Sequence, residues 1–313
     1  MLRLALFLLF LFLAPVAANA ASCTFSVTNV NFGNVDVLAG SPVDTTATLN
    51  INCTSVVSGF VRVCPNLNAG SEGATAGIRH MRFAGTALFY NLYQNAARSI
   101  PWGSAENSSL GSPPTFDFTT SVGGSVSATR TIYARVLGNQ PSVGAGLYTS
   151  QFSGSQTRII YGEVATFNCA TSAGGSFRRA TFSVQANVAA NCSVTAQNIN
   201  FGSHGVLDAA ADATGGIAVS CTPGTAYNVG LNNGLSGTSP TARRMTLGGQ
   251  AVTYGLYKDA ARSEPWGGTI GTDTAAGVGA GATQDLPVYG RVPAQSTPPP
   301  GTYTDTVVVT VTY

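Results

Sequence analysis

Stretches in which apolar and polar residues alternate recur along the chain, and they predict strands. A clear example lies between residues 181 and 189, where the apolar positions are Phe182, Val184, Ala186 and Val188. A period of two residues is typical of a strand with one buried face. The C-terminal stretch 306–313 is β-branched at nearly every position, which also favours a strand. Gly and Pro clusters separate these stretches, so we expect an all-β protein of antiparallel sandwiches.

The first twenty residues have the pattern of a secretory signal peptide. Arg3 precedes an apolar run from Leu4 to Leu13, and Ala18-Asn19-Ala20 forms an A-x-A cleavage site. The apolar run is shorter than the roughly 20 residues that a membrane-spanning helix needs. We therefore expect residues 1–20 to be removed by cleavage after Ala20 and the remaining protein to be exported.

The exported part of the chain contains one pattern twice. The repeated segments are, in pairs, 23–33 and 192–202, 92–103 and 256–267, 132–136 and 288–292, and 146–149 and 301–304. Their order and spacing hold in both copies, which indicates a duplicated domain. We expect an N-terminal domain over residues 21–180 and a C-terminal domain over residues 181–313, each of ordinary domain size.

The repeat also restricts the disulfide pairing. The six cysteines are Cys23, Cys53, Cys64, Cys169, Cys192 and Cys221, and all follow the expected cleavage site. An even count in an exported chain implies disulfides, although six cysteines allow 15 pairings. Cys23–Cys53 and Cys192–Cys221 are equivalent pairs of the two copies, which leaves Cys64 and Cys169 as a third pair. No C-x-x-C motif occurs, so we expect no metal site.

Charge and candidate chemistry exclude several classes of function. Charged residues make up 9% of the chain, against about 25% in an average soluble protein. Such a small and nearly balanced charge argues against nucleic acid as a partner. Neither His80 nor His204 recurs in the other copy, and no G-x-S-x-G, phosphate-loop or calcium-loop motif occurs. We expect no enzyme and no cofactor.

Taken together, the repeated motifs resemble the spore coat protein U domain family. They are Cys…Asn-Phe-Gly…Cys, Tyr-x-Leu-Tyr followed by Ala-Ala-Arg, Pro-Trp-Gly, Tyr-x-Arg-Val and Gly-x-Tyr-Thr. That family supplies subunits of archaic (Csu-type) chaperone–usher pili. The resemblance implies immunoglobulin-like pilin sandwiches, of which the C-terminal one lacks its last strand. A periplasmic chaperone fills this gap first, and after assembly at an outer-membrane usher the donor strand of the adjacent pilin fills it.

The ends of the two domains then predict a place in the pilus. Only Ala21 and Ser22 would precede the first cysteine, so the N-terminal domain has no strand to donate. The C-terminal domain ends at Tyr313, which we align with Arg158. Its chaperone or acceptor strand would present Val307, Val309, Val311 and Tyr313. A subunit that accepts a strand and donates none belongs, by the polarity of the family, at the extracellular pilus tip.

The N-terminal domain must be complete in itself, and two segments are candidates for its last strand. One is residues 159–167, which the Cys64–Cys169 bridge would hold in place. The other is residues 181–189, donated in cis through Phe182, Val184, Ala186 and Val188. The alternative for residues 181–189 is an ordinary first strand of the C-terminal domain. The sequence does not separate these readings.

Three loops of the N-terminal domain carry apolar residues that the C-terminal domain lacks. They are residues 54–60, 112–118 and 139–147, with the candidate adhesive residues Val56, Val57, Phe60, Phe116, Phe118, Val143 and Leu147. Exposed apolar loop tips would bind abiotic or host surfaces; the alternative is that they pack into the sandwich. We expect a tip adhesin that mediates surface attachment or biofilm formation. The alternatives are a secreted coat or matrix protein and a free carbohydrate-binding module.

Overall fold

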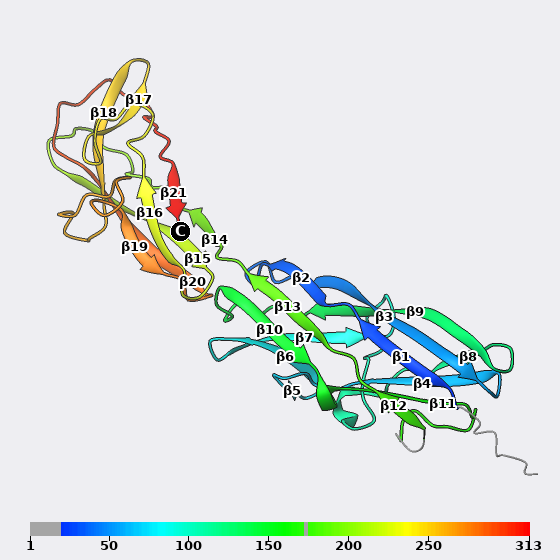
Figure 1. The fold of residues 1–313 in the computed structure, drawn as a ribbon. Coiled ribbons are helices and arrows are strands. Elements are labelled where there is room, and N and C mark those ends of the chain that lie inside the picture. Colours follow the sequence, from blue (N-terminus) through cyan, green and yellow to red (C-terminus); the bar gives the residue numbers. More distant parts are fainter. Residues whose placement is uncertain (1–19, 172–174) are drawn as a thin grey trace, which may run out of the picture.

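The computed structural model describes residues 20–171 and 175–313, and over these ranges the chain forms two β-sandwiches (Figure 1). Apart from Ala20, the expected signal peptide lies outside the described residues. Two short 3-10 turns, Ser108–Leu110 and Gly154–Gln156, are the only helical elements among them. No helix within these ranges is long and apolar enough to cross a membrane. The expected all-β fold is confirmed.

The larger sheet of the first domain holds most of its strands. Its order is β1 (Ser22–Val27), β3 (Val43–Val56), β9 (Gly124–Val136), β7 (Thr86–Tyr93), β6 (Ile78–Phe83), β10 (Gly146–Phe152), β13 (Phe182–Val188) and β2 (Val30–Val35), and β5 (Ala74–Thr75) pairs with β6. All neighbours are antiparallel except β13 and β2, which run parallel. Since β13 lies inside this sheet, we place the end of the first domain after Val188, beyond the expected boundary at residue 180.

The smaller sheet of the first domain covers the other side of the core. Its order is β12 (Ser176–Arg178), β11 (Thr157–Gly162), β4 (Phe60–Leu67) and β8 (Phe116–Thr119). β10 and β11 follow each other in the chain, so this stretch passes from the larger sheet to the smaller one. The stretch β12–β13 runs antiparallel to it and pairs with both strands in turn.

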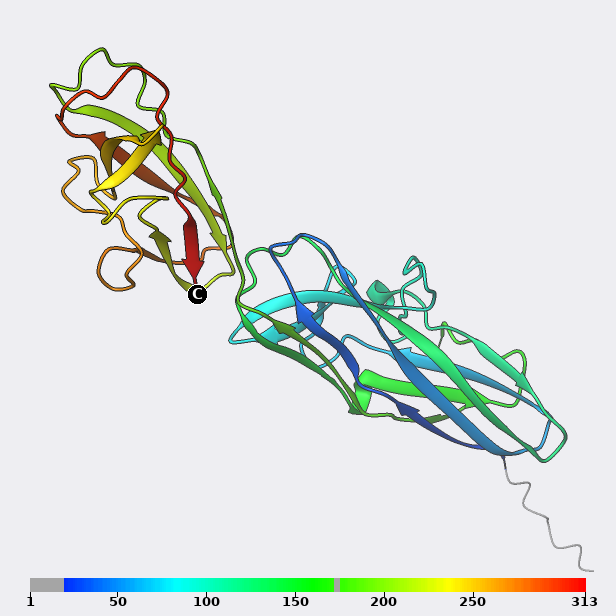
Figure 2. The same ribbon diagram turned by 90° about the horizontal axis from the view of Figure 1, so that it is seen from above.

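The second domain repeats this plan with fewer strands. One sheet has the order β14 (Cys192–Ala196), β15 (Ala211–Cys221), β20 (Thr283–Val292), β18 (Gln250–Tyr257) and β17 (Arg243–Leu247); the other has β19 (Ala275–Val278), β16 (Ala226–Leu231) and β21 (Val309–Thr312). Figures 1 and 2 show the two domains end to end, with the end of β21 close to their junction.

The three expected disulfides are present. Cys23–Cys53 joins β1 to β3, and Cys192–Cys221 joins β14 to β15 at the equivalent place. Cys64–Cys169 joins β4 to the segment after β11. Ile160 and Phe167 pack around this third bridge in a small buried cluster of their own.

A buried arginine organises each domain in the same way. Arg79 donates hydrogen bonds to the carbonyl oxygens of Asn68 (2.8 Å), Leu67 (2.7 Å) and Trp102 (2.7 Å). Arg243 binds the equivalent carbonyl oxygens of Asn232, Leu231 and Trp266. The indole N–H of Trp102 also donates to the carbonyl oxygen of Pro65 in β4, and that of Trp266 to the carbonyl oxygen of Val229 in β16, both at 2.9 Å. Because the same irregular loops are held by the same bonds, the two domains are structural copies.

Candidate functional site

β13 completes the larger sheet of the first domain. It pairs along its length with β10 on one side, from Gly146↔Val188 to Phe152↔Phe182, and with β2 on the other. Its apolar face, which comprises Phe182, Val184, Ala186 and Val188, is buried in the core. Without β13, β10 and β2 would lose their common neighbour, and the core would open between them.

β11 (Thr157–Gly162) contains the start of the first candidate segment, residues 159–167. It does not distinguish the first domain from the second, because the second domain contains its counterpart, β21. β11 pairs with β4 through Thr157↔Leu67, and β21 pairs with β16 through Val309↔Leu231. In this register Tyr313 corresponds to Tyr161, so the expected alignment of Tyr313 with Arg158 is wrong. The reason is the turn Gly154–Gln156 between β10 and β11, for which the second domain has no equivalent residues.

The second domain has an open groove where the first domain has β13. The counterpart of β2 is residues 199–204 and that of β10 is residues 301–307; both are described, and neither forms a strand. Only an isolated bridge, Thr246↔Thr304, repeats the β6–β10 contact of Arg82↔Thr149. The two segments have lost regular structure because the strand that would pair with both is absent from the described chain.

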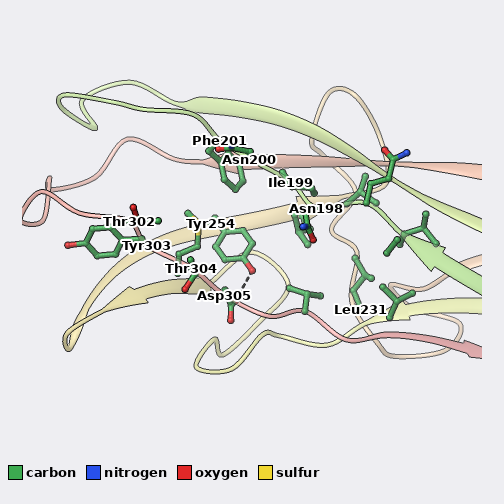
Figure 3. Close-up of a pocket in the computed structure, with 18 residues that line it drawn as sticks. Asn198, Ile199, Asn200, Phe201, Leu231, Tyr254, Thr302, Tyr303, Thr304 and Asp305 are labelled. Carbon is green, nitrogen blue, oxygen red and sulfur yellow. Dashed lines mark hydrogen bonds between the residues drawn. The ribbon is translucent and has the colours of Figure 1, made fainter.

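We call this opening the acceptor groove, after the expectation that a strand of another protein binds there, with residues 196–207 as one wall and 297–309 as the other. The groove consists of two adjoining cavities of about 500 and 600 Å³. Side chains of the core, such as Ile217, Leu256 and Val288, form its floor. Figure 3 shows Phe201 on one side, Thr302–Asp305 on the other and Tyr254 between them.

Side chains along the acceptor groove are less buried than their counterparts in the first domain. Phe32, Met81 and Tyr148 are buried, whereas the equivalent Phe201, Met245 and Tyr303 are only partly buried. These residues are aromatic or apolar and occupy the same places in the repeat. Their exposure therefore reflects the missing strand and not a change in chemistry.

One polar pair lies at the bottom of the acceptor groove. The hydroxyl of Tyr254 donates to Oδ2 of Asp305 at 2.7 Å (Figure 3). Burial raises the pKa of Tyr254, and the bond to the Asp305 carboxylate raises it further. Asp305 also accepts the backbone N–H groups of Leu235 and Thr306. The pair holds the wall 301–307 onto the domain while its strand partner is absent.

Four residues were expected on the acceptor strand, and the structure places them differently. Val307 and Val309 line the acceptor groove. Val311 lies in β21, where it is partly buried and packs against the core of the second domain. Tyr313 is 57% exposed, and its hydroxyl donates to Oδ1 of Asn191 at 3.4 Å, in the linker between the domains.

Three turns meet at the end of the first domain that lies away from the second domain, and each presents an exposed valine. Val57 lies between β3 and β4, Val122 between β8 and β9, and Val164 after β11; they are 42%, 80% and 59% exposed. Backbone bonds join the first two turns, from Thr120 to Gly59 at 2.9 Å. We call this surface the distal tip. Of the three valines, only Val57 was predicted from the sequence.

Several expected adhesive residues are not available to a surface. Val56 and Val143 are 0% and 3% exposed, so their assignment as exposed loop residues is wrong: each packs into the core. Phe116 and Phe118 lie in strand β8 and not in a loop, and β8 pairs with β4. The guanidinium group of Arg130 lies 5.0 and 4.9 Å from the two ring centroids, so the rings are partly covered.

The remaining two residues lie at opposite ends of the first domain. Phe60 begins β4 near the distal tip and is half-buried. Leu147 is 52% exposed, but it lies in β10 beside the last residues of β13, at the junction with the second domain (Figure 1). A Cβ added to Gly144 would lie 3.2 Å from the carbonyl oxygen of Pro223, in the second domain. The loop 139–147 therefore faces the second domain.

The described residues contain no cluster of three or more His, Cys, Asp or Glu side chains that would hold a metal ion. The cysteines of this part of the chain are all in disulfides.

Comparison with known proteins identifies a family and a similar fold. The sequence profile described as Spore Coat Protein U domain matches residues 9–155 and 178–310. "Protein U" of Myxococcus xanthus is 34% identical over 151 residues, which cover 43% of this chain and 84% of that protein.

Among solved structures, the chaperone–tip adhesion subunit complex CsuC–CsuE, from the archaic chaperone-usher Csu pili of Acinetobacter baumannii, has a TM-score of 0.53 and 19% identity. The match covers 93% of this chain and 100% of that chain. For the CupB6 tip adhesin from Pseudomonas aeruginosa the match covers 93% of this chain and 94% of that chain, with a TM-score of 0.38 and 14% identity. The similarity to the CsuC–CsuE complex supports the fold of this chain.

Proposed function

Because the chain belongs to the Spore Coat Protein U domain family, we propose that it is a non-enzymatic tip subunit of an archaic chaperone–usher pilus. The observation that carries this proposal is the contrast between the two domains. In one chain, the same place in the same fold is filled by β13 in the first domain and open in the second. β13 acts as a donor strand in cis, and the acceptor groove receives a strand from another protein.

The first domain serves as the template for this exchange. A strand in the acceptor groove would run antiparallel to residues 301–307 and parallel to residues 199–204, as β13 does between β10 and β2. Its backbone would pair with both walls, and its alternate apolar side chains would cover Phe201, Met245 and Tyr303. A periplasmic chaperone supplies the strand before assembly at the outer-membrane usher, and the adjacent pilin supplies it afterwards.

The proposed position at the tip rests on the expected cleavage site. With cleavage after Ala20, a single residue would precede β1, which begins at Ser22 and already pairs with β3. The exported protein would then accept a strand and donate none. It would pass through the periplasm and end extracellularly, at the tip of the fibre.

The distal tip is the proposed adhesive surface. Val57, Val122 and Val164 project from three turns at the end that points away from the fibre. Grouped apolar side chains in solvent favour binding to other apolar surfaces. We propose that they mediate attachment to abiotic or host surfaces and so contribute to biofilm formation.

The acceptor groove can be tested by filling it. We would extend the chain beyond Tyr313 with a short Gly-Ser linker and a second copy of residues 181–189. The control carries the same extension with serine at its four apolar positions. We expect the apolar extension to raise the melting temperature of the second domain and the serine extension to leave it unchanged. Equal melting temperatures would favour a secreted coat or matrix protein or a free carbohydrate-binding module.

A further inference from the structure

The carboxylate of Glu163 joins three segments at the distal tip. Its Oε1 accepts the backbone N–H of Ala21 at 2.6 Å, and its Oε2 accepts the backbone N–H of Ser58 at 2.8 Å. Ala21 precedes β1, Ser58 lies in the turn between β3 and β4, and Glu163 follows β11. One side chain thus connects the start of the chain to the turn that carries Val57.

The exposure of the chain changes sharply between Ala20 and Ala21. Ala20 is exposed, whereas Ala21 is 7% exposed and belongs to the hydrophobic core. The A-x-A site predicts hydrolysis of the bond between these two residues. A signal peptidase would add water across this bond, so that Ala20 leaves as a carboxylic acid and the nitrogen of Ala21 becomes an amine. At neutral pH this amine is largely protonated.

We infer that Glu163 is the binding site for the α-ammonium group that export leaves on Ala21. The inference rests on the proposed export, because without cleavage the same nitrogen remains an uncharged amide. After cleavage, the 2.6 Å hydrogen bond becomes an ion pair between a half-buried carboxylate and a charged amine. Hydrogen bonds between charged groups are stronger than those between neutral ones.

The surroundings of Glu163 are suited to this role. Burial raises its pKa, but the N–H groups of Ser58 and Ala21 outweigh burial and hold the pKa below its usual range, so the group is a carboxylate. The nearby guanidinium of Arg62 is engaged elsewhere, with Asp117 at 2.7 Å and with the carbonyl oxygen of Phe167 at 2.8 Å.

The consequence is that processing and the shape of the distal tip are linked. The new N-terminus is held at the tip, where it cannot act as a donor strand. The same carboxylate orders the turns that carry Val57 and Val164. A precursor that keeps its signal peptide lacks the charge that completes this contact.

The reactivity of the α-amine tests the inference. The chain contains a single lysine, Lys258, so acylation of the full-length exported protein at pH 7 modifies two amines that peptide mass spectrometry separates. An ion pair with Glu163 raises the pKa of the α-amine. Each pKa unit lowers the fraction of amine that is neutral, and therefore reactive, about tenfold. We expect the α-amine of Glu163→Gln to react several-fold faster relative to Lys258. In Glu106→Gln, which removes a carboxylate that binds Arg158 at 2.8 Å, the rate should not change.

A second variant keeps Glu163 and moves the amine away. Insertion of Gly-Ser between Ala20 and Ala21 should give the fast rate with the carboxylate intact, which covers the case in which Glu163→Gln folds poorly. An exported protein that begins at Ala21 and shows equal α-amine rates in wild type and both variants would overturn the inference. So would a mature N-terminus at another residue. Neither result affects the acceptor groove, whereas an unprocessed protein would contradict the proposed export itself.

Discussion

The ring of Phe182 stacks on the ring of Phe152, with the centroids 4.5 Å apart and the planes 13° from parallel. This pair anchors the first residue of β13 to the end of β10, at the edge of the core. The counterpart of Phe152 in the second domain is Val307, which faces the acceptor groove. The stacked pair that anchors β13 therefore has no counterpart among the described residues of the second domain.

Replacement of Phe182 by alanine should destabilise the first domain by about 3 to 5 kcal/mol, as is usual for a buried phenylalanine. The substitution removes the stacked ring and leaves a cavity under β13. Denaturant unfolding of the first domain measures the change in the free energy of unfolding. Ser183→Ala, on the other face of the same strand, should change it by no more than about 0.5 kcal/mol. A cost for Phe182→Ala as small as that of Ser183→Ala would show that β13 does not hold the domain together.

The buried arginines should be essential for the fold although they lie outside the acceptor groove. Burial lowers the pKa of Arg79 to about 10, which leaves the group charged at neutral pH. Arg79→Met would leave the carbonyl oxygens of Leu67 and Trp102 without this donor. We expect a loss of about 3 kcal/mol or more in the free energy of unfolding.

Arg82→Met is the matched control for Arg79→Met. The Arg82 side chain is exposed; it donates to the carbonyl oxygen of Gly85 at 3.1 Å and lies 3.9 Å from the Glu72 carboxylate. Its replacement should cost about 0.5 kcal/mol or less. Equal costs for the two methionine variants would contradict the organising role of the buried arginine.

His80 should make the first domain less stable in mild acid. Burial lowers its pKa below the ordinary value of 6.5, and the charge of Arg82 lowers it further. The unfolded chain therefore binds a proton at a higher pH than the folded domain does. The free energy of unfolding should fall as the pH drops below about 6.5 and stop falling below the folded-state pKa.

Melting temperatures at pH 8 and pH 5.5 measure this dependence. His80→Gln, which cannot titrate, should lose less stability between the two values than the wild type. His204→Gln is the control, because His204 is exposed. The role of His80 would be refuted if His80→Gln and the wild type had the same dependence.

Substitution of Val57, Val122 and Val164 by serine should reduce attachment to hydrophobic surfaces. Because all three side chains are exposed, the melting temperature should change little. The control is serine at Val206 and Leu235, which are exposed at 61% and 77% in the second domain. Adhesion of pili that carry each variant is the measurement. Equal loss in both variants would mean that general hydrophobicity, and not the distal tip, governs attachment.

Much of the fold was predictable because duplication adds information to a single sequence. Equivalent cysteines identified the pairs Cys23–Cys53 and Cys192–Cys221, and the third pair followed. The alternation of Phe182 to Val188 predicted a half-buried strand, but not which domain would bury it. That choice depends on the neighbours β10 and β2, which are distant in the sequence.

The candidate adhesive residues were harder to predict, because exposure is decided by tertiary packing. Val56 and Val57 are adjacent in the chain, yet one ends a buried strand and the other begins a turn. Val122 is a single apolar residue among Thr, Ser and Gly, and Val164 falls within the candidate strand 159–167, so the sequence pattern marks neither as an exposed turn residue. Their common position at the distal tip becomes visible only when the three turns are placed side by side.

Hydrogen exchange of equivalent segments within one chain tests the central claim most directly. In the monomeric protein without a partner, the amides of residues 146–152 are covered by β13, whereas those of residues 301–307 border the open acceptor groove. We expect slow exchange in the first segment and exchange that is faster by orders of magnitude in the second. Equally slow exchange in both segments would mean that the second domain is already complete, and would contradict the open acceptor groove.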